Sequence, residues 1–377
     1  MCDEAETVTF PVFQPDGFRT VYSAPDYDDA HDTPYYRSFT ELSASTRATS
    51  GRRVGGMSTT VLDQAEVVQV NDNNHALFDM VRLRDRSVVV VDPDLYRKAL
   101  PTFMTDGEAL APAAIGEVRR TDVLLLELDA VALSGGVVAT SEHECSAGLA
   151  SLISFAELLR RAAKAYLDID ESELEVGLQA WRPGDTLSHR LFVADALDNG
   201  AGYAVELGRP EVLQSLLDAI RVDYRLRLEG DDHRASCTSS CPQCLRNYQN
   251  RFSHWALDWR LALDVADLAN GDPLGIDRWL ERADELTSGF VQAFGGYTPL
   301  SVTSAAGLPA LVSTERGGCA VLLGHPLWRR TALGVNDAQT VAIAELTRSG
   351  VRHVSLSDLH ALDRRPVAVY AQLLGSS

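Results

Sequence analysis

The feature that most constrains the fold is a group of three cysteines near the middle of the chain. Cys237, Cys241 and Cys244 place half of the six cysteines within eight positions. The last two stand in "CPQC", and a gap of two residues lets both sulfurs of one turn reach a single tetrahedral ion at about 2.3 Å. We therefore expect a metal ion, with zinc as the best match to these ligands, to shape this loop.

A structural zinc ion requires a fourth protein ligand. His233 is the nearest candidate and gives the spacing His-x3-Cys-x3-Cys-x2-Cys. A ligand from elsewhere is the alternative, either His254 downstream or His143 and Cys145 brought in by the fold. A three-cysteine or empty site also remains open. Our first candidate set is His233, Cys237, Cys241 and Cys244 around one structural Zn²⁺.

Other uses of clustered cysteines fit the sequence less well. Six cysteines in 377 residues do not make a disulfide framework. A redox role for "CPQC" would need a thioredoxin-like surrounding pattern, which is missing, and unligated cysteines are the remaining alternative. The chain contains no His-Glu-x-x-His motif and no zinc-deaminase motif. We therefore expect any zinc here to be structural.

The basic residues exclude several common activities. Only Lys98 and Lys164 are lysines, and neither follows a glycine, so the chain has no Walker A loop. A His-x-Lys pair of the phospholipase D type and a Glu-x-Lys nuclease signature are also missing from the sequence. The net charge of −19 argues against wrapping nucleic acid with the whole surface. We therefore expect little or no enzymatic activity from this chain alone.

Composition and the first residues suggest a location. The hydrophobic share of 45% and the charged share of 23% are ordinary values for a globular protein. No apolar run approaches the roughly 20 residues that a membrane helix needs, and "MCDEAETVTF" does not resemble a secretory signal. We expect a cytoplasmic protein without membrane contact.

A basic and aromatic stretch surrounds the cysteines. Its arginines are Arg234, Arg246, Arg251 and Arg260, and its aromatic residues are Tyr248, Phe252, Trp255 and Trp259. Arginines bind phosphates and aromatic rings stack on bases, so this mixture suits single-stranded nucleic acid. For Trp255 and Trp259, four residues apart, we favour simple packing on one helix face. The predicted nucleic-acid contacts are Arg234, Arg246, Tyr248, Arg251 and Arg260.

The residue pattern predicts a mixed α/β or α+β protein of three modules. Residues 1–135 form an irregular, β-rich module, with a hairpin predicted around Asn71–Asn74. Residues 136–275 form a central α/β domain with the zinc knuckle, which includes a broad apolar helix face over 146–167. Residues 276–377 form a module in which a strand, a helix and a second strand imply a parallel βαβ unit.

A glycine turn and nearby acids permit an alternative. Gly200 and Gly202 lie between a strand and a helix, where a tight turn is the favoured interpretation and a phosphate contact the rival. Asp195 and Asp198 beside this turn, with His325 of "GHPLW", could serve a metal-dependent nuclease or hydrolase. Such a site requires the carboxylates to converge, which a sequence does not show.

Three segments in order resemble a known family. They are "SFAELLRRAAKAYLDIDESELEVGL", "LFVADALDNGAGYAVEL" and "CTSSCPQCLRNYQNRFSHWALDWRLALD". Together they resemble the MrfA-type zinc-binding domain, found at the C-terminus of many bacterial DEAD/DEAH helicases, over roughly residues 140–272. The variant here looks most similar to members in DISARM-like anti-phage defence systems. Repair members carry four cysteines, whereas this cluster offers three.

The resemblance implies a role beside a motor protein. In the family this domain follows two RecA-like motor lobes, which this sequence does not contain. Either a separate helicase chain supplies the motor, or this chain is a helicase fragment that arose by splitting. The expected function is a non-catalytic, zinc-binding accessory subunit of a helicase machine in anti-phage defence or DNA repair. It would guide DNA, most plausibly single-stranded, or dock a helicase or ATPase supplied in trans. A pure protein scaffold is the further alternative.

Overall fold

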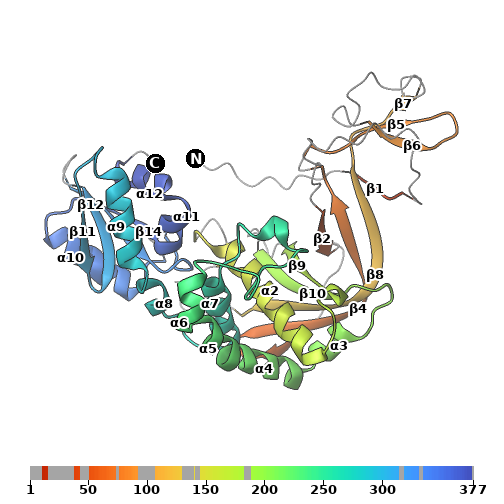
Figure 1. The fold of residues 1–377 in the computed structure, drawn as a ribbon, viewed down its shortest axis with the longest axis horizontal. Helices are drawn as coiled ribbons and strands as arrows, with labels where there is room; N and C mark the ends of the chain where they lie inside the picture. The colour runs from red at the N-terminus through yellow and green to blue at the C-terminus, as the bar shows by residue number, and fades with distance from the viewer. Residues whose placement is uncertain are drawn as a thin grey trace. The chain divides into compact units, whose positions relative to one another are not determined.

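The computed structural model describes residues 11–15, 38–42, 51–73, 76–91, 107–129, 140, 145–181, 188–313, 318–330 and 334–375 (Figure 1). Contacts divide the chain into two compact units. The first unit comprises Met1–Thr46 and Gln64–Thr121, and the second comprises Arg47–Asp63 and Asp122–Ser377. The fold is mixed α/β, as the sequence predicts.

Among its described residues, the first unit is built from strands. They are β1 (Val12–Phe13), β2 (Ser38–Leu42), β5 (Asp79–Arg82), β6 (Val88–Val91), β7 (Glu108–Ala109) and parts of β4 (Met57–Asn71) and β8 (Ala114–Leu128). The hairpin predicted around Asn71–Asn74 is wrong in its pairing. In the described ladders β4 pairs with β2, β3 (Arg52–Val54) and β8, whereas β5 pairs with β6 and β7. Strands on either side of a turn can find partners from distant segments, which local alternation does not reveal.

The central part of the second unit places one long helix on a sheet. Helix α2 (Gly148–Leu167) packs against β9 (Leu174–Trp181), β10 (Ser188–Asp195) and α7 (Trp259–Asn270) (Figure 1). The apolar face predicted from the sequence is buried, with Phe155 and Leu158 fully covered. β10 pairs antiparallel with both β8 and β9.

Short helices connect β10 to the cysteine loop. They are α3 (Tyr203–Leu207), α4 (Pro210–Ala219), η3 (Ile220–Tyr224), α5 (Arg225–Leu228) and α6 (Asp231–Ser236), and 3-10 turns lie at η2 (Glu171–Glu173) and η4 (Arg251–Ser253). A π turn at η3 lies between α4 and α5. Inserted π turns shift the side chains that follow them without ending the helix, and periodicity alone does not show them.

Helix α7 is the buried centre of this region. Asp258 caps its start, because the carboxylate accepts a hydrogen bond from the Arg260 amide at 2.9 Å. Gly271, with φ of +84°, ends it in the left-handed conformation that glycine adopts without strain. Every residue from Trp259 to Ala269 is buried, which marks a core helix rather than an amphipathic surface helix.

The C-terminal part contains the predicted βαβ unit. Its elements are α8 (Asp277–Leu280), α9 (Ala283–Phe294), β11 (Leu300–Ala305), β12 (Leu308–Ser313), β13 (Cys319–Gly324), α10 (Asp337–Arg348), β14 (His353–Asp358), α11 (Leu359–Arg364) and α12 (Pro366–Leu373). β13 and β14 pair in parallel and α10 connects them, which confirms the prediction.

Alternation along the strands gives this sheet two buried faces. Ala310, Ala320 and Leu322 pack against Ala342 and Leu346 of α10. The intervening residues, such as Leu311 and Val321, join the core that also contains α2 and α7. The second unit therefore has one apolar core that continues from the central region into the C-terminal sheet.

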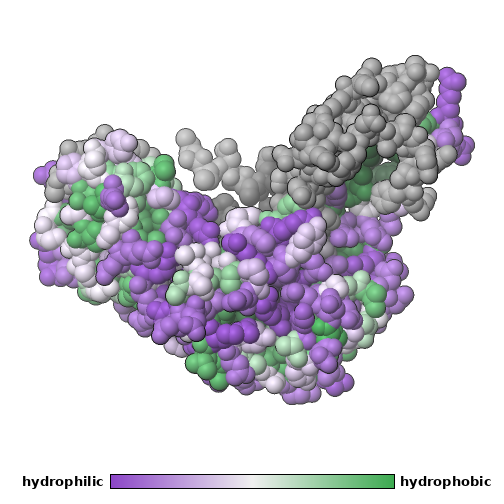
Figure 2. Space-filling view, in the orientation of Figure 1, coloured by the Kyte–Doolittle hydropathy of each residue, from purple (hydrophilic) through white to green (hydrophobic). Residues whose placement is uncertain are grey.

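The surface agrees with the composition. Figure 2 shows that hydrophilic residues cover most of the described surface visible in this view, with smaller hydrophobic patches between them. Among the described residues, no helix is both long and apolar enough to cross a membrane.

Candidate metal centre

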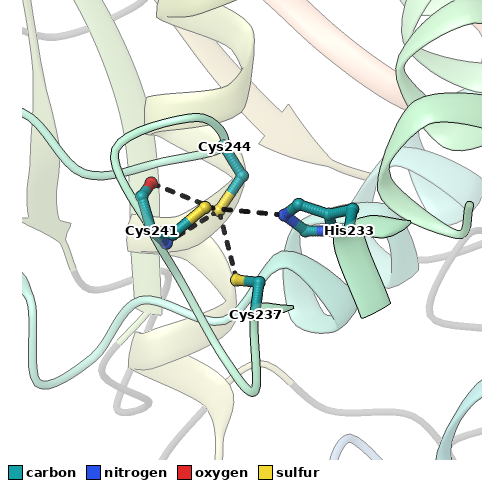
Figure 3. Close-up of side chains that lie close together, drawn as sticks. All are labelled: His233, Cys237, Cys241 and Cys244. Carbon is teal, nitrogen blue, oxygen red and sulfur yellow. Dashed lines mark hydrogen bonds between the residues drawn. The ribbon is translucent and has the colours of Figure 1, made fainter. Parts of the chain in front are cut away.

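His233 is held in position by the end of the preceding helix, α5. It lies on α6, and its Nδ1 is 2.8 Å from the Leu228 carbonyl oxygen, so this nitrogen carries the proton and donates. The lone pair of Nε2 then faces the cysteines, 3.7 Å from the Cys241 sulfur (Figure 3). A hydrogen bond of this type at the other ring nitrogen is what orients histidine ligands of metals.

The three cysteines follow on the loop after α6. The Cys237 amide donates to the His233 carbonyl at 2.8 Å and so ends the helix above the site. In "CPQC" the Cys241 amide donates to the Cys244 sulfur at 3.0 Å. The amides of Cys244, Leu245 and Arg246 all donate to the Cys241 carbonyl at 3.0–3.1 Å, which closes a tight knuckle.

The four side chains point toward one another (Figure 3). One ligand atom from each of His233, Cys237, Cys241 and Cys244 lies within 4.8 Å of the other three. The Cys237 and Cys244 sulfurs are 3.8 Å apart. A zinc–sulfur bond of about 2.3 Å in a tetrahedron gives a sulfur–sulfur separation of about 3.8 Å, so the donor set and its spacing fit zinc.

Crowding of the thiols changes their acidity. The hydrogen bond from Cys237 lowers the pKa of Cys244 to about 5, against the effect of burial. The same hydrogen bond, with burial, raises the pKa of Cys237. The group therefore holds thiolate charge in a largely buried place, a condition that a bound cation relieves.

The rival ligands lie in other environments. His254 Nε2 is 2.9 Å from the Asn250 side-chain oxygen and 3.1 Å from the Asn247 carbonyl. Cys145 is fully buried, and burial raises its pKa to about 12. His143 lies outside the described residues. Within the described part of the chain, only the His233 group gathers three or more metal-binding side chains. Its assignment as the zinc ligand set remains a proposal.

The predicted nucleic-acid arginines differ in exposure. Arg234 is partly exposed and pairs with Glu281 at 2.7 Å. Arg246 is half-buried and donates to the Ser240 hydroxyl at 2.9 Å. Arg260 is only 4% exposed, donates to the Thr238 carbonyl at 2.7 Å and stacks on Trp259. Because Arg260 belongs to the buried helix α7, its position does not fit a phosphate contact.

The two tryptophans lie in opposite environments. Trp259 is 1% exposed, and its ring packs edge-on to His233 with centroids 5.6 Å apart. Trp255 is 60% exposed, so the packing expected for both residues holds only for Trp259. Tyr248 is exposed as well. Trp255 was missed as a surface residue because the helix begins only after it, at the Asp258 cap.

The backbone amides of the glycine turn bind a carboxylate of the same chain. The buried Asp195 carboxylate accepts hydrogen bonds from the amides of Ala201, Gly202, Tyr203 and Ala204 at 2.6–3.1 Å. These amides form an anion-binding nest that the carboxylate fills. A tight turn, and not a phosphate contact, is therefore the better interpretation.

The hydrolase alternative loses its candidate residues. Asp195 is committed to this turn, and Asp198 is exposed. His325 lies 3.1 Å from the buried Asp264, with its Nδ1 accepting from the Leu327 amide. Asp195 and His325 are thus held in separate structural contacts, so the geometry gives no support to a shared catalytic site.

Comparison with known proteins assigns the region around the cysteines. The family model of the MrfA Zn-binding domain matches residues 155–245. A crystal structure of the DUF1998 helicase MrfA bound to DNA is similar at 13% identity, covering 63% of this chain and 26% of that chain, with a TM-score of 0.35. The same helicase with DNA and AMPPNP gives 14% identity, 63% and 23% coverage and a TM-score of 0.26. No curated protein matches the chain.

The chain thus spans about a quarter of the length of those helicase chains. The family match lies inside the range of the resemblance seen in the sequence and includes His233 and the three clustered cysteines. Residues 155–245 of this chain therefore match the MrfA Zn-binding domain.

Proposed function

We propose that this chain is a non-catalytic accessory subunit of a helicase-based DNA-processing machine, stabilised by one structural zinc ion. The observation that carries the proposal is the convergence of four ligand atoms within 4.8 Å inside the matched domain. His233, Cys237, Cys241 and Cys244 would hold the ion.

The burial of the site favours a structural zinc over a catalytic one. Cys237, Cys244 and His233 are buried. A catalytic zinc keeps one position open for water or substrate, whereas four protein ligands close the coordination shell. The ion would fix the loop and supply no reaction step.

The loop that zinc would fix connects two helices of the core. The Trp259 amide at the start of α7 donates to the Ser239 carbonyl at 2.9 Å. From α2, Arg161 donates to the carbonyls of Gln243 and Pro242 at 2.9 and 3.1 Å. Ordering the loop therefore orders the contact between α2 and α7, on which the domain depends.

The motor would be a separate polypeptide. The sequence has no Walker A loop, because neither Lys98 nor Lys164 follows a glycine. We propose that a helicase or ATPase acting in trans supplies ATP hydrolysis, in anti-phage defence or DNA repair in the cytoplasm. The resemblance to DISARM-like members supports the first setting.

The chain would contact DNA through the segment after the knuckle. Arg246 and Arg251 reach the surface there, and Arg234 reaches it on α6 just before the knuckle, although Arg234 also pairs with an acid. The acidic remainder of the chain would limit contact to this local path and favour a single strand over a wrapped duplex.

Metal content and activity of the full chain test the proposal together. We expect about one zinc per chain in wild type and in Cys319→Ser, which changes a cysteine outside the group, and loss of zinc in Cys237→Ser. Purified chain should neither hydrolyse ATP nor cleave DNA with Mg²⁺. Salt-dependent binding of single-stranded DNA supports a DNA role, whereas salt-independent or absent binding would favour a protein scaffold.

A further inference from the structure

Two large aromatic side chains face solvent on the segment that follows the knuckle. Tyr248 is 76% exposed and Trp255 is 60% exposed. The first lies four residues after Cys244, and the second lies outside the capped helix α7. Neither ring contributes much to the core, so both are free to contact a ligand.

The backbone that presents these rings is fixed. Asn247 and Asn250 each accept the other's backbone amide at 2.9 Å, and the Asn250 side chain also donates to the Leu245 carbonyl at 2.8 Å. His254 Nε2 lies 2.9 Å from the Asn250 side-chain oxygen, within hydrogen-bonding distance. A binding surface held in place loses little conformational entropy when a ligand arrives.

An arginine lies against one of these two rings, Tyr248, and against the neighbouring Phe252. The Arg251 guanidinium carbon is 4.5 Å from the centre of the Tyr248 ring and 4.4 Å from that of Phe252. Stacking of this kind restricts the guanidinium and leaves a positive charge beside an exposed ring. Phosphate and base contacts are thereby available within a few residues.

The local charge differs from the rest of the chain. Residues 237–257 contain no aspartate or glutamate, although the chain has 53 acids in 377 residues. Glu171 approaches this segment from η2, where it accepts from the Asn247 side chain at 3.0 Å. Arg160 of α2 donates to the Gln249 side chain at 2.9 Å and is paired with Glu157 of the same helix at 2.6 Å. Arg246 and Arg251 are the arginines of the segment itself, so its own charge favours a polyanion over a basic partner.

We propose that Tyr248 and Trp255 are base-stacking positions for single-stranded nucleic acid. The inference rests on the proposed function and adds that the bases, and not only the phosphates, are bound. Exposed rings next to arginines are the combination that single-strand-binding proteins use. In a duplex the bases are already stacked on one another, so these rings would discriminate in favour of a single strand.

The test compares two strands that carry the same phosphates. Zinc-loaded full chain is titrated into labelled oligo-dT and into an abasic strand of equal length, with binding measured by fluorescence anisotropy. We expect each stacked base to favour oligo-dT by roughly 5- to 150-fold, from about 1–3 kcal/mol per base, so that two stacked bases multiply the preference. Trp255→Ala and Tyr248→Ala should each reduce that ratio, and Trp255→Phe should retain most of it.

Tyr297→Ala is the matched control, because this tyrosine is 81% exposed and lies between α9 and β11. It should leave the ratio unchanged, and zinc content checks that every variant is folded. Equal binding of both strands by wild type, or an unchanged ratio in Trp255→Ala and Tyr248→Ala, overturns the stacking sites alone. Absence of binding to either strand removes the DNA role and this inference together.

Discussion

Two buried polar clusters in the second unit contrast in how their charge is balanced. The His233 group gathers three cysteines and one imidazole and includes no positively charged side chain. The second cluster centres on Asp264 of α7, which accepts from Trp279 Nε1 at 2.8 Å and pairs with Arg278. Arg278 also reaches Asp267 and Glu229. A cation for the first cluster would have to come from a bound metal ion, whereas the second cluster contains its own.

This difference distinguishes the proposed metal site from the Asp264 cluster. We call the Asp264 cluster the internal tie, because its side chains link elements of the chain without a metal. A buried carboxylate with an arginine, an indole N–H and a nearby imidazole is already satisfied. Thiolates without a cation are not. The Asp264 cluster joins α7 to α8 and to the end of β13, so it connects the central region to the C-terminal sheet. The cysteine cluster joins the same helix to α6 and the knuckle.

Removal of the metal should have the largest effect. Structural zinc contributes binding free energy on the order of 10 kcal/mol, comparable to the whole stability of a domain. Cys237→Ser, or treatment of wild type with a strong chelator, should abolish the cooperative thermal transition followed by near-ultraviolet circular dichroism. Cys319→Ser should melt as wild type does. A Cys237→Ser protein with an unchanged transition would contradict a stabilising ion.

Breaking the internal tie should cost less. Asp264→Ala leaves the buried Arg278 without its principal partner and should destabilise the chain by about 3–5 kcal/mol in urea unfolding. The control is Glu66→Ala, which removes an exposed partner of Arg120 and should cost at most about 1 kcal/mol. Zinc content should remain unchanged in both variants. Loss of zinc from Asp264→Ala would show that the two clusters are not independent.

The internal tie should also respond to pH through His360. Burial, ahead of the opposing charge of Asp358, lowers the pKa of His360, whose ring lies edge-on to Trp279. Because the folded pKa is depressed below about 6.5, the unfolded chain binds the proton first. The contribution of His360 to the free energy of unfolding is therefore fully present above about pH 6.5. It is lost as the pH drops toward the folded pKa, by about 1.4 kcal/mol for each unit by which the pKa is depressed.

The variant His360→Gln isolates this effect. Between pH 7.5 and 6.0 its stability should fall less steeply than that of wild type, as measured by urea unfolding at each pH. Zinc content is measured at the same pH values, so that acid release of the metal is recorded separately. Equal slopes for the two proteins, with zinc retained, would remove His360 as the source.

We expect the smallest effect from changing one surface arginine beside the His233 group and measuring DNA binding. Arg246→Gln should weaken single-stranded DNA binding similarly for all sequences and reduce the slope of log K against log salt by about 0.7. Arg348→Gln removes an exposed arginine from the end of α10 and should leave the slope unchanged. An effect of equal size from both changes would indicate net charge rather than a local contact.

The local patterns of the sequence predicted which four side chains converge, whereas the metal ion itself stays a prediction. The spacing of Cys237, Cys241 and Cys244 describes a knuckle directly, and His233 lies one helical turn before Cys237, which brings it to the same side. The apolar periodicity of α2 and the βαβ order of the C-terminal part are equally local. The division into three modules at residues 135 and 275 stays a prediction. The contacts place residues 122–377 in one compact unit.

What the sequence did not show depends on long-range packing. Arg260 is of a residue type that binds phosphates, yet α7 is buried on all sides. The Arg260 guanidinium donates to the Thr238 carbonyl instead. Trp255 and Trp259 have helical spacing, but the helix cap lies between them. The acceptor of the nest at Gly202 is Asp195, which no spacing rule identifies.

The most direct measurement is X-ray absorption at the zinc edge of the purified full chain. The account predicts three sulfur ligands at about 2.3 Å and one nitrogen at about 2.0 Å, with one sulfur lost in Cys241→Ser. A shell of oxygen and nitrogen ligands, or a fourth sulfur in place of the nitrogen, would contradict the assignment of His233 and the three cysteines as a closed structural site.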